Sequence, residues 1–164
     1  SIRLFMVKDP RTLKISNLPN STVELPNHPS NKMGTRKVMV EDSVFLSSDD
    51  VKSLKIGDQL RLMGLGNVKI TSINSEITGE FTGDERDVNF MKLQWVSQKN
   101  AHELKILIPQ RLFVDDKFNE ESLEEIHVYV EPHYLELSNG EEIQFVRFGY
   151  CRKDSSKQAI FTHK

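Results

Sequence analysis

Apolar and polar residues alternate along many short stretches of this chain, and a two-residue period of this kind predicts β-strands. Strands are expected at residues 3–7, 13–15, 22–25, 37–44, 59–62, 68–73, 76–81, 90–96, 103–109, 127–131, 134–137, 142–150 and 158–162. Glycine, asparagine and serine separate many of them, as in the Ser-Asn-Gly turn at residues 138–140. Many short strands at close spacing favour small barrels over an α/β sheet, so the predicted fold class is all-β.

Helical signals occur in two places only. Two serines and two aspartates at residues 47–50 form a good N-cap cluster for a short helix over residues 49–54, which Gly57 ends. Asn119 can cap a second short helix that runs to Ile126. Helices are therefore expected to contribute little to the fold.

The segment at residues 25–38, LPNHPSNKMGTRKV, cannot form a regular element over most of its length. Pro26 and Pro29 lack backbone donors, and each biases the preceding residue toward extended geometry. Gly34 can adopt turn conformations that other residues avoid. From the residues alone, this segment is a long polar surface loop that leads into a strand.

Composition limits the class of protein. The chain has 164 residues, 37% of them hydrophobic and 28% charged, which fits a soluble globular protein with one large or two small domains. Its apolar runs are far too short to span a bilayer, and no secretory signal opens it, so we expect no membrane partner. A single cysteine, Cys151, excludes an intramolecular disulfide and fits a reducing, cytoplasmic location. The initial Ser1 suggests a fragment of a longer protein.

Charge is unevenly distributed although the net charge is only −2. Residues 1–40 carry a net charge of +5, residues 113–145 carry −9, and the tail is basic again. This asymmetry indicates one face for a polyanion and another turned away from it, or simply well-solvated charges. The near-zero total argues against indiscriminate nucleic-acid binding.

No catalytic or metal-binding motif stands out in the sequence. Phosphate-binding, dinucleotide-binding and zinc-protease signatures are absent. The five histidines are scattered without metal-ligand spacing, and the paired carboxylates at residues 115–116 and 124–125 lie in an acidic run without a partner histidine or arginine. We expect no catalytic residues, metal or cofactor in this chain.

Several motifs occur in a recognisable order. DPRTLKI at residues 9–15 precedes PNHP at 26–29 and MGTR at 33–36. These are followed by residues 54–70 (LKIGDQLRLMGLGNVKI), 93–97 (LQWVS), 110–113 (QRLF) and 143–155 (IQFVRFGYCRKDS), and the chain ends in AIFTHK. Together they resemble the C-terminal anticodon-binding region of class I glutaminyl-tRNA synthetases and archaeal-type glutamyl-tRNA synthetases, over nearly the whole chain.

This resemblance implies two six-stranded barrels stacked end to end. Residues 1–25 and 101–164 would form the proximal barrel, nearer the catalytic core, and residues 26–100 would form the distal barrel. The partners implied are the anticodon stem-loop of a tRNA and a catalytic domain in the same polypeptide. The parent enzyme would join glutamate to tRNA with ATP and magnesium, which this fragment would not bind.

The resemblance also assigns candidate anticodon-binding residues. Arg3 corresponds to an arginine that contacts the middle anticodon base, and Gln144 corresponds to a glutamine that reads the same base, a uridine. Arg61 matches an arginine near the first base. Without the resemblance, Arg61 and Gln144 would be outward residues on alternating strands, and Arg3 a disordered terminal residue.

One departure from the glutaminyl pattern favours the glutamyl type. Ser53 stands where the glutaminyl enzymes have an arginine near the third base, and its neighbours Lys52 and Lys55 are further candidate anticodon-binding residues. The third base is the one that differs between the glutamine and glutamate anticodons, so its reader stays unassigned. The basic residues Arg36, Lys37 and Arg147 are expected to contact phosphates.

We therefore expect an anticodon-binding region of an archaeal-type glutamyl-tRNA synthetase. The same region of a glutaminyl-tRNA synthetase is the alternative within this class. Alternatives from other classes are a ribosomal-RNA-binding barrel and a protein-docking module that uses the acidic face at residues 113–145.

Overall fold

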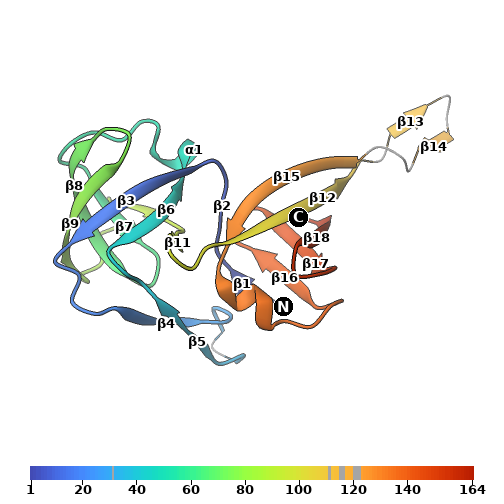
Figure 1. The fold of residues 1–164 in the computed structure, drawn as a ribbon, viewed down its shortest axis with the longest axis horizontal. Helices are drawn as coiled ribbons and strands as arrows, with labels where there is room; N and C mark the ends of the chain where they lie inside the picture. Colours follow the sequence, from blue (N-terminus) through green and yellow to red (C-terminus); the bar gives the residue numbers. More distant parts are fainter. Residues whose placement is uncertain (31, 111, 115–116, 120–122) are drawn as a thin grey trace.

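The computed structural model describes residues 1–30, 32–110, 112–114, 117–119 and 123–164. It consists of two lobes of β-structure that lie side by side (Figure 1). Each lobe is built on one curled, mostly antiparallel sheet, and two separate hairpins complete the strand structure. The all-β, two-barrel prediction is confirmed.

The first sheet joins the two ends of the chain. In spatial order its strands are β1 (Ile2–Leu4), β16 (Glu142–Phe145), β17 (Gly149–Lys153), β18 (Gln158–His163), β12 (His102–Pro109), β15 (Leu123–Val130) and β2 (Met6–Val7). Its core contains Leu4, Ile106, Val130, Tyr134 and Phe145, each no more than 1% exposed.

The second sheet comes from the middle of the chain. Its strands, in spatial order, are β10 (Met91–Leu93), β7 (Gln59–Leu62), β8 (Gly66–Ile73), β9 (Ile77–Gly83), β3 (Pro10–Ser16), β6 (Ser43–Ser47) and β11 (Val96–Ser97). Each sheet has seven strands where six were expected, since each includes a two-residue segment, β2 or β11, beside the junction. The pairing places β3 in the second sheet, whereas residues 1–25 were expected together in the first barrel.

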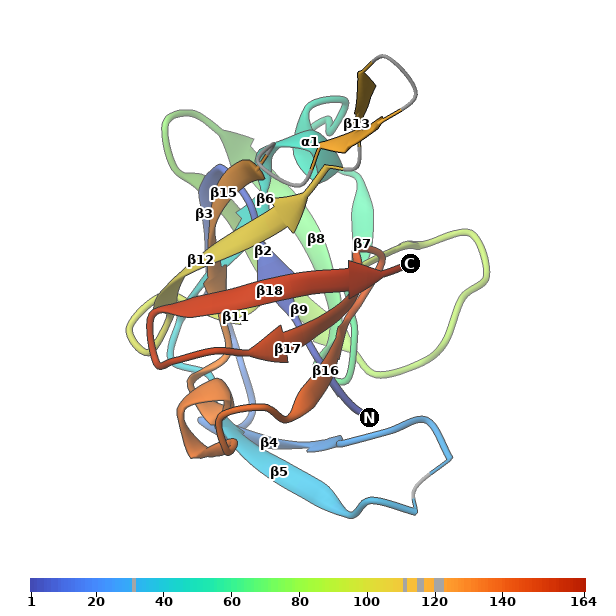
Figure 2. The same ribbon diagram turned by 90° about the vertical axis from the view of Figure 1, so that its right-hand side faces the viewer.

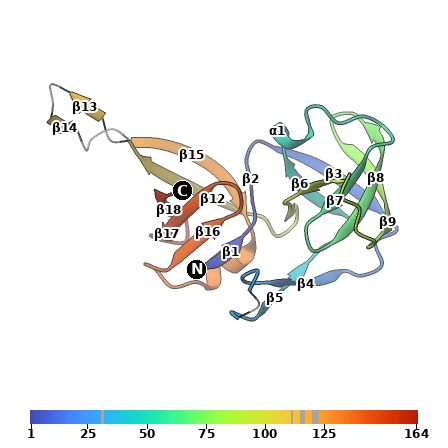
Figure 3. The same ribbon diagram turned by 180° about the vertical axis from the view of Figure 1, so that it is seen from behind.

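Two hairpins lie outside these sheets. β4 (Thr22–Pro26) pairs with β5 (Thr35–Met39) and extends along the side of the junction between the lobes (Figures 1 and 3). β13 (Leu112–Val114) pairs with β14 (Lys117–Asn119) and projects from the far end of the first lobe (Figures 1 and 2). The predicted acidic paired residues at 115–116 lie outside the described residues.

Both helices in the described part of the chain are short. The helix expected at residues 49–54 is present as α1 (Ser48–Val51). The helix expected from Asn119 to Ile126 is wrong for the described residues: Asn119 ends β14, and β15 starts at Leu123, where its long antiparallel pairing with β12 outweighs the capping signal. Neither helix is long and apolar enough to cross a membrane.

Several predicted strands are also interrupted or replaced: residues 3–7 divide into β1 and β2, and residues 37–44 are shared between β5 and β6. Residues 134–136 belong to a 3₁₀ helix, η1 (Pro132–Glu136), and Leu137 is its C-cap, because Pro132 starts a helical turn that buries Tyr134. The strand expected at 90–96 breaks into β10 and β11. The strand expected at 142–150 is a hairpin, which turns where Arg147 adopts a left-handed conformation with φ 61°.

Buried polar and aromatic groups join the two lobes. The Gln94 side chain accepts a hydrogen bond from the Met6 N–H (3.0 Å) and donates one to the Val146 carbonyl (3.0 Å). Trp95, only 1% exposed, donates from Nε1 to the Met63 carbonyl and packs against Phe5. Trp95 therefore packs in the core at the junction of the lobes.

Candidate nucleic-acid interface

Two residues expected at the interface, Arg3 and Gln144, lie side by side. β1 and β16 pair in parallel, and their register places Arg3 directly beside Gln144. Arg3 Nε donates to Gln144 Oε1 over 2.8 Å. Both side chains are partly exposed, since they alternate with buried neighbours on their strands. Residues from opposite ends of the chain thus form one polar pair on the outer face of the first sheet.

This pair keeps hydrogen-bonding capacity for a ligand. Within the described part of the chain, the terminal guanidinium nitrogens of Arg3 and the amide nitrogen of Gln144 make no hydrogen bond. An arginine can bond bidentately and stack, and an amide offers both a donor and an acceptor. The pair can therefore recognise the edge of an unstacked base.

A pocket of about 280 Å³ opens beside Arg3 at the junction of the lobes. Its lining combines apolar side chains with three arginines: Arg3, Phe5, Leu25, Pro26, Pro29, Arg36, Met63, Gly64, Arg86 and Val146. None of the residues that the structure shows lining it is a carboxylate. Such a pocket suits a flat, electron-rich group such as a nucleobase.

The loop before β5 shapes one wall of this pocket. The Arg3 N–H donates to the Asn27 carbonyl (2.7 Å), and the Asn27 side chain donates to the Met33 carbonyl (3.1 Å). Gly64, also in the lining, adopts φ +76°, and a Cβ there would lie 2.1 Å from Leu25 Cδ2. The proline-rich loop is thus part of the candidate site and not only a surface connection.

The predicted phosphate-contacting role of Arg36 is not compatible with its position. Arg36 is 5% exposed, and its guanidinium forms a bidentate ion pair with Glu131 (Nε–Oε1 2.6 Å, Nη2–Oε2 2.8 Å). Nη1 donates to the Pro26 carbonyl and to Asn27 Oδ1. These bonds hold the β4–β5 hairpin against the first lobe, so Arg36 lines the pocket with a guanidinium that is already paired.

Arg61 is also largely buried, at 9% exposed. It donates to Asn67 Oδ1 and the Asp84 carbonyl, both at 3.2 Å, and to Asp84 Oδ1 at 3.1 Å. Asn67 in turn donates to the Glu85 carbonyl over 2.6 Å. Arg61 therefore anchors the loop that carries Arg86, and it does not join the Arg3–Gln144 pair.

The remaining predicted residues are exposed and lie apart from one another. Lys52 and Lys55 follow α1 in the second lobe, where Lys52 lies 3.9 Å from Asp49. Lys37 projects from β5 opposite Glu24. Arg147 reaches from the β16–β17 turn to donate to the Lys92 carbonyl in β10 (2.7 Å), which links the lobes again. All four could contact phosphates.

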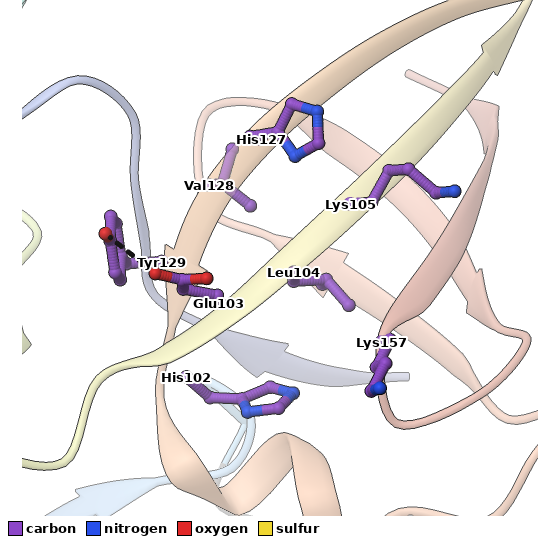
Figure 4. A pocket seen from close by; sticks show the side chains of 8 residues that line it. All are labelled: His102, Glu103, Leu104, Lys105, His127, Val128, Tyr129 and Lys157. Carbon is purple, nitrogen blue, oxygen red and sulfur yellow. Dashed lines mark hydrogen bonds between the residues drawn. The ribbon is translucent and has the colours of Figure 1, made fainter.

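A larger open cavity, about 580 Å³, lies on the outer face of β12 and β15 (Figure 4). Lys105 and His127 face one another across these strands, and Glu125 lies 3.8 Å from the former and 3.7 Å from the latter. The Tyr129 hydroxyl donates to Glu103 (3.2 Å), and this bond raises the pKa of Tyr129. Charges of both signs alternate here, so this cavity does not present a field suited to a polyanion.

Four residues in or around the pocket were not predicted from the sequence. Phe5 and Arg86 line it, and Gln94 and Glu131 bond to Val146 and Phe5, which line it. Phe5 and Gln94 lie within predicted strands and carry no separate signal. Glu131 follows an apolar strand and precedes a proline, where a surface carboxylate would be the usual expectation. A buried glutamate with a distant arginine partner leaves no local pattern in the chain.

Comparison with known families gives matches along most of the chain. Two family models, both described as the anticodon-binding domain of class I tRNA synthetases (E and Q), match residues 1–89 and 92–154. The first match ends in the loop between β9 and β10, and the second begins within β10.

Similar proteins include the glutamate–tRNA ligase of Nitrosopumilus maritimus, which is 58% identical over all 164 residues. The glutamate–tRNA ligases of Cenarchaeum symbiosum and Korarchaeum cryptofilum are 45% and 34% identical over 99% and 97% of the chain. The chain spans only 29%, 29% and 27% of the lengths of these three relatives.

Proposed function

Because the chain belongs to the anticodon-binding domain family of class I tRNA synthetases for glutamate and glutamine, we propose that it binds the anticodon loop of a glutamate tRNA. The protein to which it belongs would join glutamate to that tRNA, with ATP and magnesium bound by a separate catalytic domain. The glutamate–tRNA ligases among its relatives support this choice over the glutamine enzyme. They also favour tRNA over ribosomal RNA or a protein partner, and a cytoplasmic location follows from the same proposal.

One observation carries the proposal: Arg3, which lines the pocket between the lobes, is hydrogen-bonded to Gln144. Reading a base in a single-stranded loop requires the base to leave its stack and to meet planar polar groups along its edge. The Gln144 amide and the Arg3 guanidinium supply such groups, and the adjoining pocket can receive the base. We assign this pair to the middle anticodon base, a uridine.

Exposed basic residues would add affinity without sequence information. Lys37, Lys52, Lys55 and Arg147 are placed to contact phosphates of the loop and stem. Arg36 and Arg61 would act indirectly, by holding the β4–β5 hairpin and the loop that carries Arg86. Binding should therefore weaken with salt, while the response to the middle base should persist.

A binding titration tests this proposal. The chain is titrated against a fluorescently labelled stem-loop with the glutamate anticodon and against the same stem-loop with its middle uridine changed to cytidine. We expect the cytidine loop to bind about 5- to 150-fold more weakly, as for the loss of one good base contact. Equal affinity for both loops would refute base reading, and a change at the third base decides between glutamate and glutamine specificity.

A further inference from the structure

Two aromatic rings extend the Arg3–Gln144 pair across the first sheet. In the register of adjacent strands, Gln144 on β16 lies opposite Tyr150 on β17, and Tyr150 lies opposite His163 on β18. The rings of Tyr150 and His163 stack with centroids 4.5 Å apart and planes 22° from parallel. Arg3, Gln144, Tyr150 and His163 thus form one row across four neighbouring strands, about 14 Å wide at the usual strand spacing.

The exposure of this row fits a binding surface and not a core. Along β17, Cys151 and Lys153 are buried while Tyr150 is only partly buried. His163 is exposed. On the neighbouring strand β16, Phe145 is fully buried, whereas Tyr150 lies on the outer face of the sheet. The Tyr150–His163 pair thus lies on the surface beside Arg3 and Gln144, where packing in the core does not account for it.

We propose that Tyr150 and His163 form a stacking platform for a second nucleobase, a neighbour of the base that Arg3 and Gln144 read. This inference rests on the proposed function, because it requires a single-stranded RNA loop. A nucleotide that unstacks to place one base at Arg3 leaves its neighbour without a stacking partner. The aromatic pair one strand away supplies a new partner, and every base has a face that can stack, so the platform is indifferent to sequence.

The geometry makes the platform rigid before RNA arrives. Thr162 Oγ1 donates to the Tyr150 carbonyl (3.1 Å), which ties β17 to β18 at this point. Gly149 precedes Tyr150 with φ +146°, where a Cβ would lie 2.7 Å from a Phe161 ring carbon and 2.8 Å from the His163 carbonyl oxygen. This close approach of the strands holds the two rings together, so little side-chain freedom is lost when a base stacks.

A cycle that combines protein and RNA changes tests the platform. The chain and its Tyr150→Ala variant are titrated with the glutamate anticodon stem-loop and with loops that lack the base at one position flanking the middle uridine. Tyr150→Ala should weaken binding of the complete loop about 5- to 150-fold, the range for one base–aromatic stack. At one flanking position the base-free loop should bind the two proteins equally. Equal losses from Tyr150→Ala with every loop would overturn the proposal.

Matched variants separate stacking from folding and from charge. Tyr150→Phe keeps the ring and should bind like the parent chain, and His163→Ala should weaken binding without touching Tyr150 itself. The slope of log affinity against log salt should be unchanged in Tyr150→Ala, because no phosphate contact is lost. If both Tyr150→Ala and His163→Ala bound the stem-loop as tightly as the parent chain, the stacking proposal would be refuted, but the proposed function would stand. Failure of the parent chain to discriminate the middle base would sink the proposed function.

Discussion

Replacing Glu131 by glutamine should strongly destabilise the junction between the lobes. The Glu131 carboxylate accepts two bonds from Arg36, at 2.6 and 2.8 Å, and a third from the Phe5 N–H at 2.6 Å. The Arg36 and Glu131 side chains are 3% and 2% exposed, so neither can be solvated by water when its partner is removed. Removing one member of a buried ion pair leaves an uncompensated charge and costs about 3–5 kcal/mol.

Urea unfolding, followed by circular dichroism, measures this cost. A domain of this size has a free energy of unfolding of about 5–15 kcal/mol, so Glu131→Gln should lower the urea concentration at the unfolding midpoint by a large fraction. The exposed pair between Lys99 and Glu41, with nitrogen and oxygen 3.0 Å apart, is the matched control. Glu41→Gln makes the same chemical change at the surface and should cost about 0–1 kcal/mol.

A second variant separates loss of charge pairing from loss of shape. Combining Glu131→Gln with Arg36→Met removes both charges, while the glutamine oxygen can still accept from the Phe5 N–H. The double variant should be less destabilised than the sum of the two single changes, since no unpaired charge stays buried. If Glu131→Gln lowered the free energy of unfolding by less than about 1 kcal/mol, the Arg36–Glu131 pair would contribute no more than an exposed ion pair does.

Four further results are expected. Burial raises the pKa of the Cys151 thiol to about 12 from 9.0, so iodoacetamide should label it at pH 8 only after unfolding. Because this folded-state pKa is raised, the stability that Cys151 contributes is full below pH 9 and should be lost between pH 9 and 12, relative to Cys151→Ala. Gly64→Ala should lower the free energy of unfolding, measured by thermal unfolding, by about 1–3 kcal/mol, because its Cβ would meet Leu25. Gly34→Ala, at a similar positive φ but with open space around its Cβ, should lower it by about 1 kcal/mol. Lys52→Ala should lower the slope of log affinity against log salt by about one without changing base preference.

Local patterns predicted most of the strands. β7 has the predicted bounds, and β8, β9, β12 and β18 match within two residues. Each of them pairs with a neighbouring strand over several consecutive residues. The prediction of a strand at residues 134–137 was wrong, because buried and exposed residues can also alternate within a single helical turn. Over so few residues, hydrophobic periodicity could not distinguish a short strand from a helical turn.

Long-range partners could not be predicted from the pattern of residues. Arg3 and Gln144 are 141 residues apart, and only the parallel pairing of β1 with β16 brings them together. Arg36 looked like a surface phosphate ligand because its basic loop is visible in the sequence, while Glu131, 95 residues away, is not. The family resemblance supplied the first pair, and nothing in the sequence supplied the second.

The central claim is that Gln144 reads the middle anticodon base. The most direct test crosses Gln144→Ala with the uridine-to-cytidine change in the stem-loop and measures all four affinities. We expect each single change to weaken binding and the double change to add little, with a coupling of about 1–3 kcal/mol. Fully additive losses would mean that Gln144 and the middle base do not contact one another, and the account would be contradicted.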